Sequence, residues 1–311
     1  LFDQFNEYLE PYIGAEGYKE LNMPERPRAK ELSNALTFLH KRHIYPIFFV
    51  DEFSFIKVLM DNSVVNPAFL HTLRQFSFEA KAGFIYAGTY DVDALLEDPK
   101  YGIQGQLVGC KKEQISEIDK HSAEELIQVL GDKLVFTKEA VDHIHRLSGD
   151  VPYFVQMICK YCGFYAVENK RSIIGYPELE HVIKILTGEF SPSESSLVKT
   201  LPDNVFQNNM FSPADPKEVN VLITSIVHFN RENKEHPRGV SMVELQELWA
   251  TQKVSAFTAK LAYSIELLTK KGVLRDALDE DLPVYTITVD LFRRWWSIHH
   301  PDITVEIGTI M

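Results

Sequence analysis

The sequence predicts a parallel α/β unit, then a bundle of short helices, then a smaller mixed domain, and three observations lead to this fold class. Two apolar runs, 45–50 and 83–88, flank a helical stretch, which is typical of a strand–helix–strand unit. Short amphipathic helices follow over 117–190. The end of the chain reads as three helices, a hairpin and a last helix. A length of 311 residues suits two or three domains.

The N-terminal region reads as two helices separated by a loop. An apolar stripe crosses residues 1–12, and Pro24 and Pro27 mark a loop over 14–28. The second helix ends in the basic cluster 41–43, and its stripe has the i, i+3, i+4, i+7 spacing of one helix face: Leu32, Ala35, Leu36 and Leu39. Because the chain opens with Leu inside an apolar stripe, we expect a fragment of a longer protein.

Polar residues follow both apolar runs, which read as parallel strands buried on both faces. Asp51 and Glu52 come directly after the first run, and Thr89 ends the second, with a helix expected over 66–81. The carboxyl ends of parallel strands face the ligand crevice of an open sheet. An Asp there can hold the water shell of Mg²⁺, and a neighbouring Glu can deprotonate a water. Ordinary strand termini followed by a polar turn remain the alternative.

The remaining elements follow from capping and breaker signals. After residue 107 no strand is expected until the C-terminal hairpin. Helices are expected over 122–130 with Ser122 as its cap, 137–148, 152–169 and 176–186. Four prolines mark a linker over 191–216. Beyond it we expect helices over 218–233, 241–250, 255–271 and 291–298, and strands over 273–275 and 284–287.

The order of three motifs resembles the AAA+/STAND superfamily of P-loop ATPases, including archaeal-type and origin-recognition-like members. The motifs are Val50-Asp51-Glu52-Phe53, Gly88-Thr89 and the turn 149–152, and the resemblance covers the chain from about residue 30. It implies the Walker B and sensor-one part of a P-loop ATPase core over 1–116, a helical lid over 117–190, the linker 191–216 and a winged-helix domain over 217–311.

The same resemblance implies roles for individual residues. Asp51 would bind Mg²⁺ through water, Glu52 and Thr89 would be catalytic, and Gly149 and Pro152 would lie near the adenine of ATP. The implied function is a nucleotide-dependent switch or motor. The alternative is a non-catalytic winged-helix module on a degenerate ATPase core, binding DNA or a protein.

Two departures from the family pattern bear on hydrolysis. The sequence contains no Gly-x-x-x-x-Gly-Lys-Ser/Thr loop and no Gly-Lys pair, so we expect that loop upstream of residue 1 and ATP and Mg²⁺ binding only together with it. The stretch 98–109, where an arginine finger would lie, offers Lys100 and no Arg. In the sheet of this superfamily, the strand before the phosphate-binding loop is central and lies beside the sensor-one strand. Without that strand, this half-core should expose a hydrophobic sheet edge.

Charge disfavours a dedicated nucleic-acid reader. The net charge is −12, and residues 201–311 carry 11 Lys and Arg against 15 Asp and Glu. Lys260, Lys270 and Lys271 on the third helix are the candidate contacts for DNA or a partner, but an acidic turn at 276–281 would repel phosphates. We therefore expect a protein partner or self-association before DNA. The cluster 293–296, Arg-Arg-Trp-Trp, is interpreted as packed tryptophans with solvated arginines, in preference to a site where nucleic-acid bases stack.

Three cysteines without framework spacing favour a reducing, cytoplasmic setting. Cys159 and Cys162 form a C-x-x-C inside a helical run, which favours packed thiols over a zinc or redox site. The longest apolar run, 44–50, is too short to cross a membrane, so no membrane partner is expected.

Overall fold

A computed structural model describes most of the chain, which divides into two compact units, Leu1–Lys112 (unit 1) and Glu113–Met311 (unit 2). The described residues are 13–21, 29–66, 68–79, 81–88, 92, 95, 98–101, 110–113, 115, 117–129, 133–190, 197–206, 210, 217–230, 237–251, 258–279 and 282–300. The expected stripe over 1–12 and Thr89 lie outside these residues. Each unit is described by itself.

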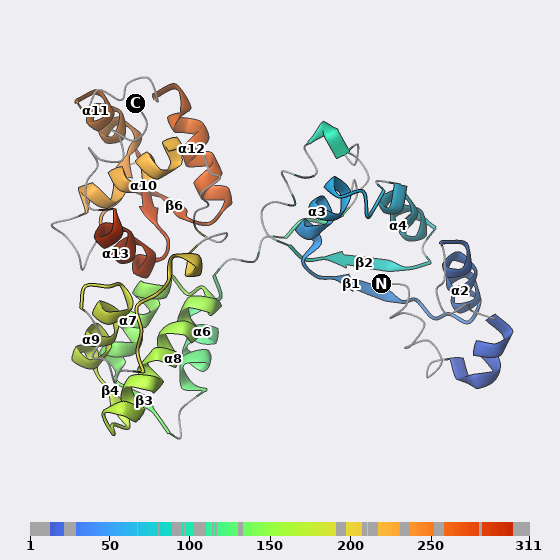
Figure 1. Ribbon diagram of the computed structural model, residues 1–311, viewed down its shortest axis with the longest axis horizontal. Helices are drawn as coiled ribbons and strands as arrows, with labels where there is room; N and C mark the ends of the chain where they lie inside the picture. The colour runs from blue at the N-terminus through green and yellow to red at the C-terminus, as the bar shows by residue number, and fades with distance from the viewer. Residues whose placement is uncertain are drawn as a thin grey trace. The chain divides into compact units, whose positions relative to one another are not determined.

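Unit 1 contains the predicted parallel strand pair. Strands β1 (Ile47–Val50) and β2 (Gly83–Tyr86) pair in parallel, with Ile47 opposite Gly83 and Val50 opposite Tyr86. In Figure 1, helices α3 and α4 lie along one side of this pair. The other elements are α2 (Ala29–Lys41), η1 (Phe53–Phe55), α3 (Ile56–Asp61), α4 (Ala68–Phe78) and η2 (Pro99–Tyr101). The strand–helix–strand order is confirmed, whereas η1 and α3 have no counterpart in the sequence prediction.

The expected loop over 14–28 is wrong in its first part, because residues 13–21 are helical. Ile13, Tyr18 and Leu21 of this helix pack against Ala35 and Leu39 of α2. The two prolines lie after the helix, at positions 24 and 27. A proline breaks a helix at its own position and does not exclude one several residues earlier.

Only one face of the two-stranded sheet is covered by described residues. Phe48 and Phe84 stack with ring centroids 5.2 Å apart, on the face packed against α2 and α4 through Leu32, Leu36 and Phe76. On the opposite face, Ile47 is 59% exposed, Phe49 73% and Ile85 48%. The prediction of strands buried on both faces is therefore wrong for this sheet as described. Apolar surface is exposed, as expected for a half-core, but on a face of the sheet.

The first half of unit 2 is helical, as predicted. Its helices are α6 (Lys120–Gln128), α7 (Lys138–Ser148), α8 (Pro152–Glu168) and α9 (Tyr176–Leu186). The cap of α6 is Asp119, whose carboxylate accepts a hydrogen bond from the Ser122 amide at 3.0 Å, so the prediction of Ser122 as the cap is wrong. A short parallel pair, β3 (Val135–Phe136) with β4 (Ile173–Ile174), was also missed, since two residues carry no readable alternation.

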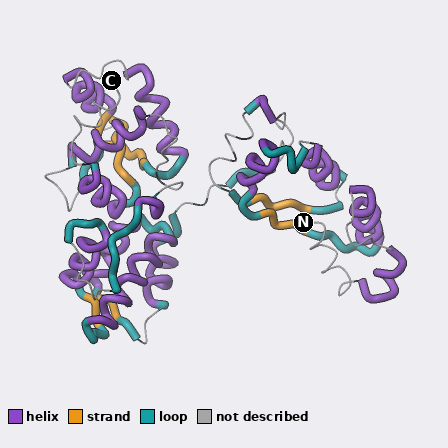
Figure 2. The backbone as a smooth tube through the Cα atoms, in the orientation of Figure 1, coloured by secondary structure: helices purple, strands orange, loops and turns teal. Residues whose placement is uncertain are grey.

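The second half of unit 2 has the predicted helices and hairpin. The elements are η3 (Asp203–Val205), α10 (Lys217–Phe229), β5 (Val240–Ser241), α11 (Met242–Thr251), α12 (Thr258–Lys270), β6 (Leu274–Asp279), β7 (Leu282–Ile287) and α13 (Asp290–His299). The hairpin strands are longer than predicted, and β5 adds a third strand in the order β5-β7-β6. Figure 2 shows the strands of unit 2 as two separate short patches among helices.

One continuous hydrophobic cluster runs through unit 2, from Ile127 to Trp296. It includes Val198, Leu201 and Phe206 from the segment expected to be a linker. The Phe206 ring lies 5.7 Å from that of Phe154 in α8 and 5.0 Å from that of Trp295 in α13. The described part of 191–216 therefore contributes buried apolar side chains to this core. The division into domains over 117–190 and 217–311 stays a prediction.

Among the described residues, no helix is long and apolar enough to cross a membrane.

Candidate functional site

The polar residues after β1 lie beside the end of β2. The Ala87 amide donates to the Val50 carbonyl at 2.9 Å, and the Phe53 amide donates to the Ala87 carbonyl at 2.7 Å. The pairing of the two chains thus continues past the last strand residues. It places Asp51 and Glu52 at the carboxyl end of the sheet, where open α/β sheets bind ligands.

The Asp51–Glu52 pair is held in a tight turn and faces solvent. Both residues are exposed, and the Glu52 amide donates to Asp51 Oδ1 at 2.9 Å. Glu52 has φ 50° and ψ 39°, a left-handed conformation that costs a non-glycine residue roughly 1 kcal/mol. The Phe55 amide closes the turn on the Glu52 carbonyl at 2.8 Å. The turn directs the chain into η1 and leaves two adjacent carboxylates accessible.

Gly88 is required by the close approach of the two chain segments. A Cβ on this residue would lie 2.7 Å from Val92 Cγ2 and 3.1 Å from the Ser54 amide nitrogen. The end of β2 therefore packs directly on the η1 backbone. Thr89 follows but is outside the described residues, so its role as sensor remains a prediction.

The carboxylates of this turn can bind Mg²⁺ only together with waters and the phosphates of a substrate. Within the described parts of the chain, no group of three or more His, Cys, Asp or Glu could hold a metal ion. Mg²⁺ commonly uses one or two carboxylates, waters and substrate phosphates, and Asp51 offers one such carboxylate. Lys100 does not extend this site, since its Nζ lies 2.5 Å from Asp61 Oδ1.

The predicted lid turn has the expected backbone, in unit 2. Gly149 ends α7 with φ 58°, Asp150 has φ 58°, and Pro152 begins α8. A Cβ on Gly149 would overlap the Thr288 carbonyl oxygen, between β7 and α13. Asp150 Oδ1 lies 2.5 Å from His145 Nδ1. The turn packs against the C-terminal half of unit 2. Asp51 and Glu52 belong to unit 1, and each of the two sets of predicted residues is described within its own unit.

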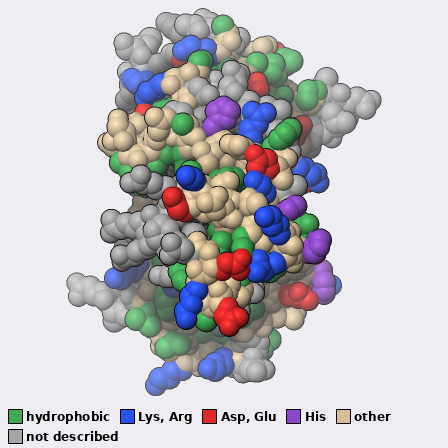
Figure 3. All heavy atoms as spheres, turned by 90° about the vertical axis from the view of Figure 1, so that its right-hand side faces the viewer, with side chains coloured by type: hydrophobic (Ala, Val, Ile, Leu, Met, Phe, Trp, Pro, Cys, Tyr) green, Lys and Arg blue, Asp and Glu red, His purple; other side chains and the backbone are tan. Residues whose placement is uncertain are grey.

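The three candidate lysines of α12 and its C-terminal turn are engaged. Lys260 Nζ bonds to Glu218 of α10, and Lys270 Nζ lies 2.9 Å from Glu266 Oε1. Lys271 is half-buried and also has a partner. On the face of the molecule in Figure 3, Lys and Arg are interspersed with Asp and Glu. None of these observations favours a basic nucleic-acid footprint.

A buried ionic cluster in unit 2 was missed by sequence reasoning, which left Arg293 and Arg294 in solvent. Arg293 is buried, and Arg294 bonds to Glu180 of α9, which also contacts His143 of α7. Burial alone would raise the pKa of Glu180, but hydrogen bonds from His143 and Arg294 and the charge of Arg294 lower it to about 2. The available signal was Asp290, placed three and four residues before the arginines.

Comparison with known proteins gives similarity only at the level of structure. No family model and no curated protein matches the chain. Among solved structures, the Thermotoga maritima RuvB Holliday junction branch migration motor is 14% identical with a TM-score of 0.35, covering 89% of this chain and 94% of that one. A point mutant of Thermotoga maritima RuvB is 11% identical with a TM-score of 0.34, covering 90% of this chain and 91% of that one. At these TM-scores the similarity does not establish a shared fold.

Proposed function

We propose that this chain is part of an AAA+/STAND-like ATPase that acts as a nucleotide-dependent switch or motor. One observation carries the proposal: Asp51 and Glu52 lie exposed at the carboxyl end of a parallel strand, hydrogen-bonded through the turn to the neighbouring strand. In this role Asp51 holds Mg²⁺ through water, and Glu52 orients and deprotonates the attacking water. Thr89 would complete the site as the sensor residue.

The proposal requires a phosphate-binding loop that the 311 residues do not contain. The fold of unit 1 supports this requirement. Among the described residues of unit 1, the parallel sheet has two strands and leaves Phe49 and Ile47 exposed, whereas the parallel sheets of α/β proteins are covered on both faces. The chain binds ATP and Mg²⁺ only together with that loop. The proposed location is the reducing cytoplasm.

Turnover tests the catalytic assignment. In the longest natural polypeptide that contains this chain, Glu52→Gln should lower the rate of ATP hydrolysis by roughly 10²-fold or more, since proton transfer contributes 10²–10⁴-fold. Glu125→Gln on α6, which changes another exposed glutamate, should leave the rate unchanged. Equal turnover by the wild type and Glu52→Gln would remove Glu52 from the mechanism.

A second candidate is a non-catalytic binding module built on the C-terminal half of unit 2. The order helix, strand, helix, helix, strand, strand from α10 to β7 supports its interpretation as a winged helix. Because Lys260 and Lys270 are paired with carboxylates, this module suits a protein partner or self-association better than DNA. A gel shift of the whole chain at low salt that weakens as salt is added would favour DNA instead.

A further inference from the structure

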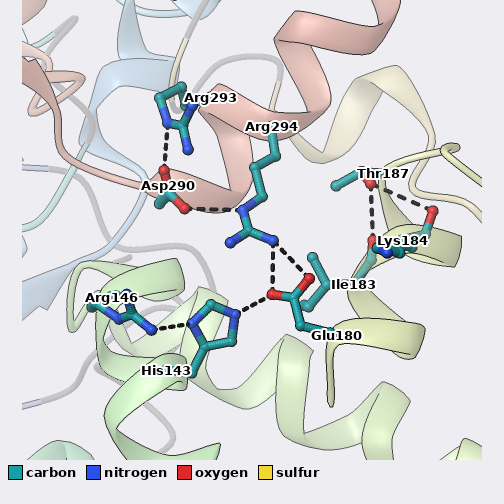
Figure 4. A network of polar contacts seen from close by, with 9 residues as sticks. All are labelled: His143, Arg146, Glu180, Ile183, Lys184, Thr187, Asp290, Arg293 and Arg294. Atoms are coloured by element: carbon teal, nitrogen blue, oxygen red, sulfur yellow. Dashed lines mark hydrogen bonds and ion pairs between the residues drawn. The ribbon is translucent and has the colours of Figure 1, made fainter. Parts of the chain in front are cut away.

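The two halves of unit 2 meet at a chain of charged side chains that sequence reasoning did not foresee (Figure 4). Arg294 of α13 points toward α9, where its Nη1 lies 2.8 and 3.1 Å from the two carboxylate oxygens of Glu180. Its Nε lies 3.1 Å from Asp290 Oδ2. Arg294 therefore joins its own helix to α9 with a fixed geometry that a lysine could not reproduce.

A histidine extends the chain of contacts to a third helix. His143 of α7 bonds to Glu180 through Nε2, and Arg146 Nη2 lies 2.9 Å from its Nδ1. Arginine carries only donors, so Nδ1 accepts and the ring proton is on Nε2, which donates to Glu180. Glu180 thus receives hydrogen bonds from α7 and α13 while belonging to α9.

The network is withdrawn from water. His143 is 1% exposed, and the side chains of Glu180 and Arg294 are each 16% exposed. Arg293 lies 2.5 Å from Asp290 Oδ1, so both adjacent arginines share this carboxylate. A buried charge that loses its partner is strongly destabilising, so these groups favour one relative position of the helices.

Packing at Gly149 and at Phe206 acts at the same interface. The chain at Gly149 lies directly against the Thr288 carbonyl, where a Cβ would overlap the oxygen. The Phe206 ring lies 5.2 Å from that of Phe292, so the connecting segment packs on α13. Apolar packing alone tolerates small shifts, whereas the charge-assisted hydrogen bonds of Arg294 to Glu180 and Asp290 depend on distance and direction.

We propose that the Arg294–Glu180–His143 network locks the two halves of unit 2, 117–190 and 217–300, into one body, so that any motion of the helical half carries the C-terminal half with it. The consequence is that the C-terminal half cannot swing independently on the 191–216 segment. The network lies within unit 2 and requires no bound nucleotide.

Hydrogen exchange of the 311-residue chain, read by mass spectrometry, tests the lock. In the wild type, the slowest amides of α8 and α10 should exchange at rates that agree within about twofold, as one cooperative unit requires. Slow amides of α10 that exchange roughly tenfold faster than those of α8 would overturn the proposal at once.

Variants separate the lock from general stability. Glu180→Gln and Arg294→Gln should release the C-terminal half, with α10 and α13 exchanging about tenfold or more faster than α8. Arg171→Gln removes the exposed ion pair with Glu178, also on α9, and should alter neither half. Equal acceleration in both halves, or none, would show that the network does not hold them together. Arg294→Lys, which keeps the charge, gives an intermediate release if the glutamine variants do not fold.

Discussion

Two glycines of unit 2 have different structural requirements, although both belong to helical regions. Gly149 has φ 58° and no room for a Cβ, whereas Gly163 lies inside α8, where a Cβ would have nothing within 4 Å. Only at Gly149 does the backbone depend on glycine. The sequence predicted this residue as a helix end from its place between two helices, but it gave no sign of the Thr288 contact.

We expect Gly149→Ala to lower the free energy of unfolding by roughly 2 kcal/mol or more, because the left-handed backbone and the overlap with Thr288 both oppose a side chain. Gly163→Ala is the matched control and should raise stability by about 0.5–1 kcal/mol, as in other helix interiors. Urea unfolding of both variants measures the difference. Losses of the same size at both positions would contradict the placement of the turn.

The three thiols should differ sharply in reactivity. Burial raises the pKa of Cys159 to about 12 and that of Cys162 well above its ordinary value, whereas Cys110 is exposed. Because the thiolate is the reactive species, a thiol reagent should label Cys110 alone in the native protein and all three after denaturation. Rapid native labelling at Cys159 would contradict the packed arrangement of the C-x-x-C residues.

Among the elements, strand β1 has one buried face and one exposed face, and substitutions on each face should differ in their effect on stability. Phe48 stacks on Phe84 within the core, and its neighbour Phe49 points to the open face. Phe48→Ala should lower the free energy of unfolding by about 3–4 kcal/mol, whereas Phe49→Thr should change it by no more than about 0.5 kcal/mol. Thermal unfolding followed by circular dichroism compares the pair. A large loss at Phe49 would mean that this face is covered in solution.

The elements themselves were largely predictable, for identifiable reasons. Helices α7 and α8 follow from Thr137, Gly149 and Pro152 at their ends and from the regular spacing of apolar residues between them. The β3–β4 pair and strand β5 could not be predicted, because strands of two residues are set by contacts distant in sequence. Burial of β1 on both faces was inferred from an apolar run, which records only that its side chains are apolar.

At the scale of the whole molecule, the acid response of unit 2 should depend on Glu180. Its pKa falls from 4.5 to about 2 on folding, so the carboxylate stabilises the protein above pH 4.5 and this contribution is lost as the pH falls toward 2. Glu180→Gln should therefore be less stable at pH 7 by roughly 2–3 kcal/mol, with the gap to the wild type narrowing on acidification. Urea midpoints between pH 7 and pH 3 measure this gap. A gap independent of pH would contradict the ionised state of Glu180.

The contacts between the two halves of unit 2 were harder to predict than the helices and strands within each half. Four prolines with Ser and Asn indicated a linker over 191–216, yet Val198, Leu201 and Phe206 are buried in the core of unit 2. Three apolar residues at irregular spacing carry no periodic signal, although each fills a place between helices. The Arg294–Glu180 pair joins residues 114 positions apart, a separation that no local pattern reports.

Magnesium-dependent ATP binding decides whether Asp51 belongs to a nucleotide site. Calorimetry on the longest natural polypeptide containing this chain should show ATP binding that needs Mg²⁺ and is weakened at least about tenfold by Asp51→Ala, since Asp51 is the proposed magnesium-site carboxylate. Asp142→Ala on α7, another exposed carboxylate, should bind like the wild type. Absence of ATP binding, or binding that Asp51→Ala leaves unchanged, would contradict the account and leave the C-terminal module as the place of function.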